Sequence, residues 1–156
     1  MQTNPHVQAQ MSDAGIDKLQ ECLRLERSAM ETYELALGHV SHVGMHSVLQ
    51  QILASHAVRA DRISARLTTL GAEVPEGSGA WGALAKALQA GADLLGDRAA
   101  LTTLKEGEDH ALGLYVEDLA STDPALRQIV DTELLPEQRR TRELCWSLKD
   151  YATAPS

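Results

Sequence analysis

Phenylalanine is absent from this chain of 156 residues, which has only two tryptophans and three tyrosines. Residues branched at Cβ are also few, with 4 isoleucines and 8 valines against 22 alanines and 23 leucines. Strands favour β-branched and aromatic side chains, whereas helices favour alanine and leucine. The composition therefore excludes an all-β sandwich or barrel, disfavours a doubly wound parallel sheet, and predicts an all-α helix bundle.

Positive charge, long apolar runs and cysteine are also scarce. The 14 basic side chains against 22 acidic ones give a formal net charge of −8, which repels phosphate backbones, so we expect no nucleic-acid partner. No apolar run reaches the roughly 18 to 20 residues that span a bilayer, and we expect a cytoplasmic protein without membrane contact. Cys22 and Cys145 are too few for a disulfide framework and are expected to be buried thiols.

Apolar residues recur at three- and four-residue spacing in four long stretches, which predicts helices over 13–40, 46–70, 97–119 and 124–151. A loop over 73–79 and a short glycine-interrupted helix over 81–95 form a long crossover between the second and third helices. Pro136 is expected to kink the last helix. We expect residues 1–11 to be disordered and residues 12–152 to form one antiparallel four-helix bundle.

Each predicted helix carries one ionisable residue in the middle of its apolar stripe. These residues are Glu26, His56, Glu108 and Glu137. If the first and fourth helices run opposite to the second and third, the rise per residue places all four within about 3 Å of one depth. The sequence therefore predicts that these side chains meet at the centre of the bundle.

Bundles with one long crossover hold two iron or manganese ions on a lone glutamate from two helices and Glu-x-x-His from the other two. Glu26 and Glu108 match the lone glutamates. The other two helices depart from the pattern, because Leu53 stands three residues before His56 and Arg140 stands three residues after Glu137. Two of the six expected ligands are therefore replaced, one of them by a permanent cation.

Three interpretations of this centre remain open. The first, which we favour, is a metal-free network in which Arg59 and Arg140 neutralise the carboxylates. The second is a site for one divalent ion, iron or manganese, and the third is a full dinuclear centre typical of a di-iron oxidase. The ligands in the second interpretation are Glu26, His56, Glu108 and Glu137.

Two further groups of residues are candidates for supporting or peripheral roles. Tyr33 and Tyr115 follow Glu26 and Glu108 by seven residues each, so their hydroxyls are expected to donate hydrogen bonds to the buried carboxylates. A cluster of histidines near the first turn could bind a metal at the surface, although imidazoles near a helix C-terminus also interact favourably with the helix dipole. The histidines of this cluster are His39, His42 and His46.

The third predicted helix contains Lys105-Glu106-Gly107-Glu108-Asp109-His110-Ala111 followed by Tyr115, which resembles the signature of a known family. Further matching pieces are Tyr33-Glu34-Leu35-Ala36, Arg59 with Leu67 and Gly71, and Gly77-Ser78-Gly79 with Trp81-Gly82. The family consists of small bacterial ferritin-like four-helix-bundle proteins known only as a domain of unknown function. The resemblance covers residues 13–150 and implies a ferritin-like fold without an assigned activity.

Two hypotheses about function follow from these patterns. The first is a non-catalytic ferritin-like bundle with a metal-handling or stress-related role, whose central site is metal-free or binds one divalent ion. The second is a structural or interaction module that forms a homodimer or docks a partner through the apolar crossover segment from Trp81 to Leu95. No nucleophile elbow, phosphate-binding loop or dinucleotide fingerprint is present in the sequence.

Overall fold

The computed structural model describes residues 10–77, 82–118 and 123–153, which form helices joined by short turns and loops. The predicted all-α class is confirmed. The helices are α1 (Asp13–His39), α2 (Val43–Thr69), α3 (Gly82–Gly113), α4 (Pro124–Ile129), α5 (Leu135–Ser147) and α6 (Lys149–Thr153). Two described segments are π-helical: η2 (Leu114–Asp118) follows α3, and η3 (Val130–Leu134) joins α4 to α5.

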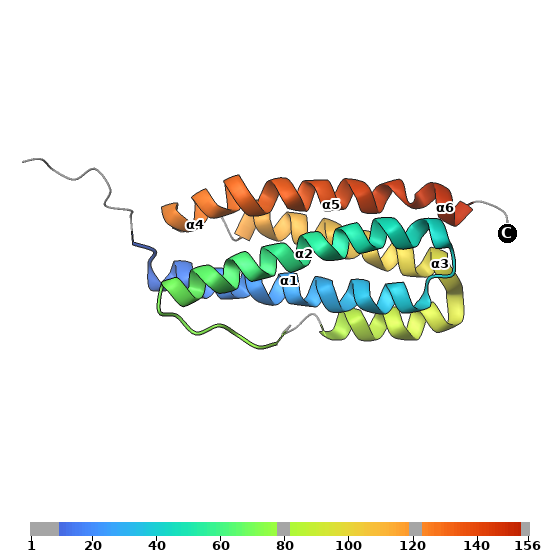
Figure 1. The fold of residues 1–156 in the computed structure, drawn as a ribbon, viewed down its shortest axis with the longest axis horizontal. Helices are drawn as coiled ribbons and strands as arrows, with labels where there is room; N and C mark the ends of the chain where they lie inside the picture. The colour runs from blue at the N-terminus through green and yellow to red at the C-terminus, as the bar shows by residue number, and fades with distance from the viewer. Residues whose placement is uncertain (1–9, 78–81, 119–122, 154–156) are drawn as a thin grey trace, which may run out of the picture.

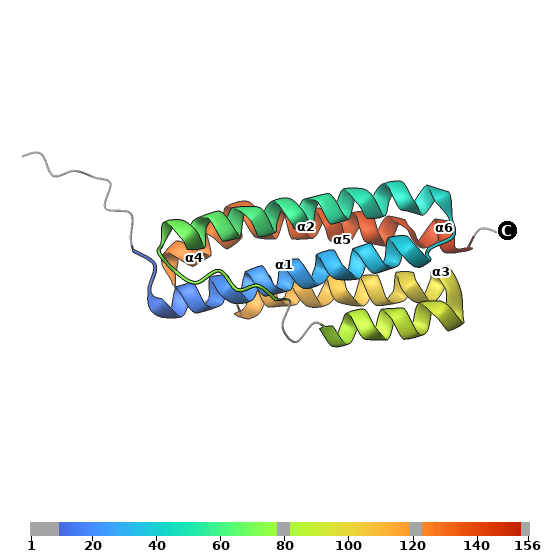
Figure 2. The same ribbon diagram turned by 60° about the horizontal axis from the view of Figure 1, so that its bottom comes forward.

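In the described part of the chain, the long helices form four helical rods that pack side by side in a bundle, as Figure 1 illustrates. The rods are α1, α2, the second half of α3, and the segment from α4 to α6. α1 packs against both α2 and α3, and α5 packs against both α3 and α2. α1 and α5 run in one direction while α2 and the second half of α3 run in the other (Figures 1 and 2). In the described part of the chain, no helix combines the length and apolar character needed to cross a membrane.

The crossover between α2 and the second half of α3 turns back at Gly96. This residue has φ 73° and ψ −163°, a backbone conformation that side chains with a Cβ rarely adopt. The first half of α3 therefore runs beside the bundle before the chain reverses (Figure 2). The side chains of residues 81–95, on which the hypothesis of a docking surface rests, lie outside the described residues. Asp97, directly after the turn at Gly96, accepts hydrogen bonds from the amides of Ser41 and His42 in the α1–α2 turn.

The N-termini of α1 and α4 are joined by one carboxylate. Asp123 Oδ1 accepts from the amides of Ala125 and Leu126 in the first turn of α4, and Oδ2 accepts from the amide and hydroxyl of Ser12, the N-cap of α1. These hydrogen bonds from Ser12 hold the pKa of Asp123 at about 2. Because one carboxylate binds both helix N-termini, it fixes the position of the N-terminus of α4 against that of α1.

The π-helical segment η3 changes which residues of the fourth rod face inward. A π turn contains one residue more than an α turn, and here the amide of Leu135 donates to the carbonyl of Val130, five residues earlier. The segment lies directly before Pro136, where we expected a kink. Counting in sevens from Val130 leads to Glu137 and then Leu144, but Leu144 is only half-buried and its neighbour Cys145 is buried. Leu148, which the apolar spacing also predicts to face inward, is buried, and Tyr151 is 40 % exposed.

Among the residues whose side chains the structure describes, the core consists of two apolar clusters with a polar layer between them. One cluster lies toward the α1 N-terminus and includes Leu19, Leu23, Leu67 and Leu126. The other lies toward the α1–α2 turn and includes Leu49, Leu101, Leu104 and Leu148. The charged residues between them are screened from water, so their interactions with one another determine their charge states.

Candidate functional site

Glu26 and Glu108 are the two carboxylates at the centre of the bundle. Glu26 projects from α1 with none of its surface exposed, and Glu108 projects from α3 with 3 % exposed. Both positions were predicted from their places in the apolar stripes. Because burying an ionised carboxylate is costly unless it is paired and hydrogen-bonded, the surrounding side chains must supply positive charge and donors.

The two tyrosines stabilise these carboxylates in a reciprocal way. Tyr33, on the same helix as Glu26, donates to Glu108 Oε1 at 2.6 Å, and Tyr115, seven residues after Glu108, donates to Glu26 Oε1. Because α1 and the second half of α3 are antiparallel, equal spacing of seven residues brings each tyrosine to the carboxylate of the opposite helix. Burial and the neighbouring carboxylate raise the pKa of both hydroxyls, so both remain donors.

His56 lies between the two carboxylates. Its Nδ1 is 2.6 Å from Glu26 Oε2 and its Nε2 is 3.2 Å from Glu108 Oε1. A carboxylate oxygen only accepts hydrogen bonds, so both contacts are satisfied when both ring nitrogens carry a proton and donate. His56 is 2 % exposed and stacks on Tyr33, with ring centroids 5.5 Å apart. The geometry therefore indicates an imidazolium bridge.

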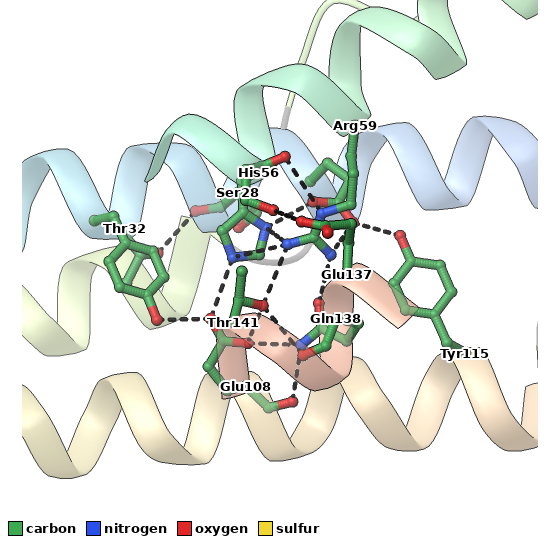
Figure 3. Close-up of polar contacts among 12 residues, drawn as sticks. Ser28, Thr32, His56, Arg59, Glu108, Tyr115, Glu137, Gln138 and Thr141 are labelled. Carbon is green, nitrogen blue, oxygen red and sulfur yellow. Dashed lines mark hydrogen bonds and ion pairs between the residues drawn. The ribbon is translucent and has the colours of Figure 1, made fainter. Parts of the chain in front are cut away.

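Arg59, one helical turn after His56, supplies the second positive charge (Figure 3). It is 1 % exposed and is among the largest fully buried side chains of the described residues. Nη1 donates to Glu26 Oε1 at 3.1 Å and to Gln138 Oε1 at 2.8 Å. Nη2 lies 3.0 Å from His56 Nδ1 and 3.5 Å from Nε2, which places it against the imidazole ring rather than in line with one nitrogen.

Gln138 and Thr141 complete the cluster, and neither residue was predicted from the sequence to lie in it. Gln138 Nε2 donates to Glu108 Oε2 at 2.7 Å, and the Thr141 hydroxyl donates to the same oxygen at 3.0 Å. Both residues follow η3, and the extra residue of its π turn brings Gln138 inward where we expected Glu137. The signal in the sequence was the polar pair Gln138 and Thr141 at a spacing of three, directly after Pro136.

Glu137 and Arg140 lie apart from the buried cluster. Glu137 accepts from Ser55 Oγ at 2.8 Å and from Arg140 Nη2 at 3.0 Å, and the two side chains are 38 % and 47 % exposed. The hydrogen bonds from Arg140, followed by that from Ser55, lower the pKa of Glu137. Of the four residues predicted to meet, the structure therefore brings together Glu26, His56 and Glu108 and places Glu137 at the margin.

The charges of the four buried ionisable residues in the cluster sum to zero. Burial acts to raise the pKa of Glu26 and Glu108, but the charges of Arg59 and His56 and the hydrogen bonds to both carboxylates lower it. Burial and the charge of Arg59 act to lower the pKa of His56, but the charge of Glu26 and the hydrogen bonds to both carboxylates raise it. Two carboxylates, one guanidinium and one imidazolium give the cluster no net charge.

We expect this balance to appear in the pH dependence of stability. The raised pKa of His56 stabilises the fold below the unfolded value of about 6.5, and this contribution is lost as pH rises through the folded pKa. The lowered pKa values of Glu26 and Glu108 stabilise the fold above about 4.3, and their contribution is lost as pH falls. Urea unfolding across this pH range should show that the free energy of unfolding falls on the alkaline side. This fall should disappear in His56→Gln and persist in His110→Gln. The same pH dependence in all three proteins would contradict the imidazolium bridge.

The oxygens of the cluster are already engaged by hydrogen-bond donors. A carboxylate offers about four acceptor sites, and Glu108 accepts from Tyr33, His56, Gln138 and Thr141. Among the residues that the structure describes, no group of three or more histidine, cysteine or acidic side chains is arranged to hold a metal ion. The arrangement around Arg59 therefore does not fit a metal centre.

Two of the histidines near the first turn and the two cysteines make contacts that stabilise the fold. His42 Nδ1 accepts from the amide of Gly44, and His46 Nε2 bonds to the carbonyl of Val40, so both stabilise the α1–α2 turn. Cys22 and Cys145 are free and buried, and burial raises the pKa of Cys145 to about 12. A hollow of about 20 Å³ beside Tyr33, His56 and Glu108 has the size of one water molecule.

Comparison with known proteins identifies the family. The family model described as "Domain of unknown function (DUF2383)" matches residues 14–121, and the chain belongs to this family. The match includes Glu26, His56, Arg59 and Glu108 but ends before Gln138. No curated protein and no solved structure matches the chain.

Proposed function

We propose that this protein is a non-enzymatic, ferritin-like four-helix bundle whose centre is closed by a metal-free ion network. In this proposal, a guanidinium tethered to α2 takes the role that a metal ion has in bundles of related architecture. The network would hold the four rods in one register and orientation, and the protein would act as a structural module.

The observation that carries this proposal is the position of Arg59. Its guanidinium contacts Glu26 from α1, His56 from α2 and Gln138 from α5. The side chain therefore bridges three of the four rods. A buried cation in contact with a carboxylate and an imidazolium would oppose the binding of a further cation at the same place.

The ferritin-like character of the fold is part of the proposal. It is supported by the long crossover between α2 and the second half of α3, which makes these two rods parallel (Figures 1 and 2). It is also supported by the central glutamates on α1 and α3. No redox or hydrolytic role follows from this resemblance, because the oxygens of these glutamates are engaged by Arg59, His56 and neutral donors.

Metal analysis of the full chain tests this proposal. Protein produced in medium containing iron, manganese and zinc, and purified without chelator, should carry far less than one metal per chain by elemental analysis. EDTA should leave its thermal unfolding temperature unchanged, because no ion stabilises the folded state. Stoichiometric metal that is lost in Glu108→Gln would refute the proposal.

The binding of one divalent ion is the second candidate function. The observation in its favour is that Glu26, His56 and Glu108, three of its four predicted ligands, lie in direct contact. An ion bound to both carboxylates would have to displace Arg59 and the tyrosine donors. The same elemental analysis separates the candidates, since this one requires one iron or manganese per chain.

A further inference from the structure

The guanidinium of Arg59 occupies a place surrounded by groups that bind cations. Glu26 Oε1 and Gln138 Oε1 accept from Nη1, the Thr141 hydroxyl lies 3.4 Å from Nη2, and the carbonyl of Ser55 lies 3.4 Å from Nε. His56 Nδ1, which donates to Glu26 Oε2, lies 3.0 Å from Nη2 and becomes a ligand for an ion when it gives up its proton. One carboxylate, one amide oxygen, one hydroxyl and one backbone carbonyl therefore converge on a single positive group, and the imidazole lies against it.

We infer that this place is a cation site that Arg59 fills from within the chain, and that the site accepts one divalent cation when residue 59 is shortened. The ligands would be Glu26 Oε1, His56 Nδ1, Gln138 Oε1 and Thr141 Oγ1, a mixed oxygen and nitrogen set suited to manganese, cobalt or zinc. This ligand set differs from the one expected from the sequence, because Glu108 and Glu137 do not belong to it.

Glu108 has an indirect role in this site. His56 Nε2 already bonds to Glu108 Oε1 at 3.2 Å, and a metal-binding histidine characteristically donates its other N–H to a carboxylate in this way. Tyr115 likewise holds Glu26 by donating to Oε1. Both supporting contacts exist before any ion binds, so the main change on binding would be the loss of the Nδ1 proton and of its hydrogen bond to Glu26 Oε2.

Charge sets the stoichiometry at one ion. In the natural chain, Glu26 and Glu108 are balanced by Arg59 and the imidazolium of His56. With residue 59 neutral and His56 binding as a neutral imidazole, one divalent ion restores the same balance. A second ion would leave two uncompensated charges in a buried centre that offers no further carboxylate, since Glu137 lies at the margin.

This inference rests on the proposed function, because it assumes that Arg59 keeps the natural chain free of metal. Arg59→Ala should bind one Co²⁺ per chain, measured by calorimetric titration and by visible absorption of the bound ion. The natural chain and Arg62→Ala, which removes an exposed arginine from the same helix, should bind none at this place. Metal in the natural chain would refute the proposed function, whereas failure of Arg59→Ala alone would refute only this inference.

Two added substitutions identify the ligands. In the Arg59→Ala background, Glu26→Gln should abolish Co²⁺ binding, and Glu108→Gln should weaken it by about 10- to 100-fold through the loss of its hydrogen bond with His56. If Arg59→Ala does not fold alone, Co²⁺ should restore its helical circular dichroism, and Arg59→Gln serves as the second variant. Stabilisation by free guanidinium but not by Co²⁺, or Co²⁺ binding that persists after Glu26→Gln, would overturn the inference.

Discussion

Replacing Glu108 with alanine is expected to lower the free energy of unfolding by about 3 to 5 kcal/mol, because it leaves buried charge uncompensated. Two cations, Arg59 and His56, would then face a single carboxylate. The substitution also removes the acceptor for Gln138 and Thr141, and an unsatisfied buried donor adds its own cost. Urea unfolding followed by circular dichroism at neutral pH measures this loss.

Glu106 provides the matched control for this substitution. It lies two residues earlier on α3, and its side chain is exposed. Glu106→Ala should change stability by about 0.5 kcal/mol or less, as is usual for surface positions. Similar losses for the two variants would contradict the placement of Glu108 at the centre of a charge network.

The second large effect is expected from Arg59 and Glu26 together. Arg59→Met should cost about 3 to 5 kcal/mol, because it leaves two buried carboxylates with one imidazolium. Adding Glu26→Gln removes one of those carboxylate charges. The double variant should therefore be more stable than the sum of the single losses predicts, by about 1 to 3 kcal/mol. Urea unfolding of the four proteins of this cycle gives the coupling energy directly.

An exposed ion pair of the same residue types serves as the reference cycle. Arg66 Nη2 lies 3.2 Å from Glu133 Oε1, and the two side chains are 44 % and 34 % exposed. Their coupling should be below about 1 kcal/mol, because water screens the charges. A coupling between Arg59 and Glu26 as small as that of the surface pair would mean that the buried contact contributes little to stability.

Much of the architecture could be predicted from the sequence. Amphipathic periodicity indicated four rods, and the common depth of their polar residues indicated a central cluster containing Glu26, His56 and Glu108. The tyrosine contacts followed from the equal spacing of Tyr33 and Tyr115 after the two glutamates. The positions of Glu26, His56 and Glu108 could be inferred because α1, α2 and the second half of α3 keep regular α-helical periodicity as far as these residues, whereas Tyr115 lies within η2.

The fourth rod could not be predicted in the same way. Heptad counting placed Glu137 at the centre and left Gln138 and Thr141 unnoticed, because a π turn before Pro136 shifts the inward face by one residue. The role of Arg59 was also only partly visible. Its spacing from His56 placed it on the correct face, but its direct contact with Glu26 and Gln138 depends on how three helices pack.

A crystal structure of the natural protein grown with Mn²⁺, with data collected to show anomalous scattering, tests the metal-free ion network most directly. The proposal predicts guanidinium density between Glu26 and Gln138, with no anomalous peak among Glu26, His56 and Glu108. A strong anomalous peak bonded to both glutamates, with Arg59 turned away from the centre, would contradict it.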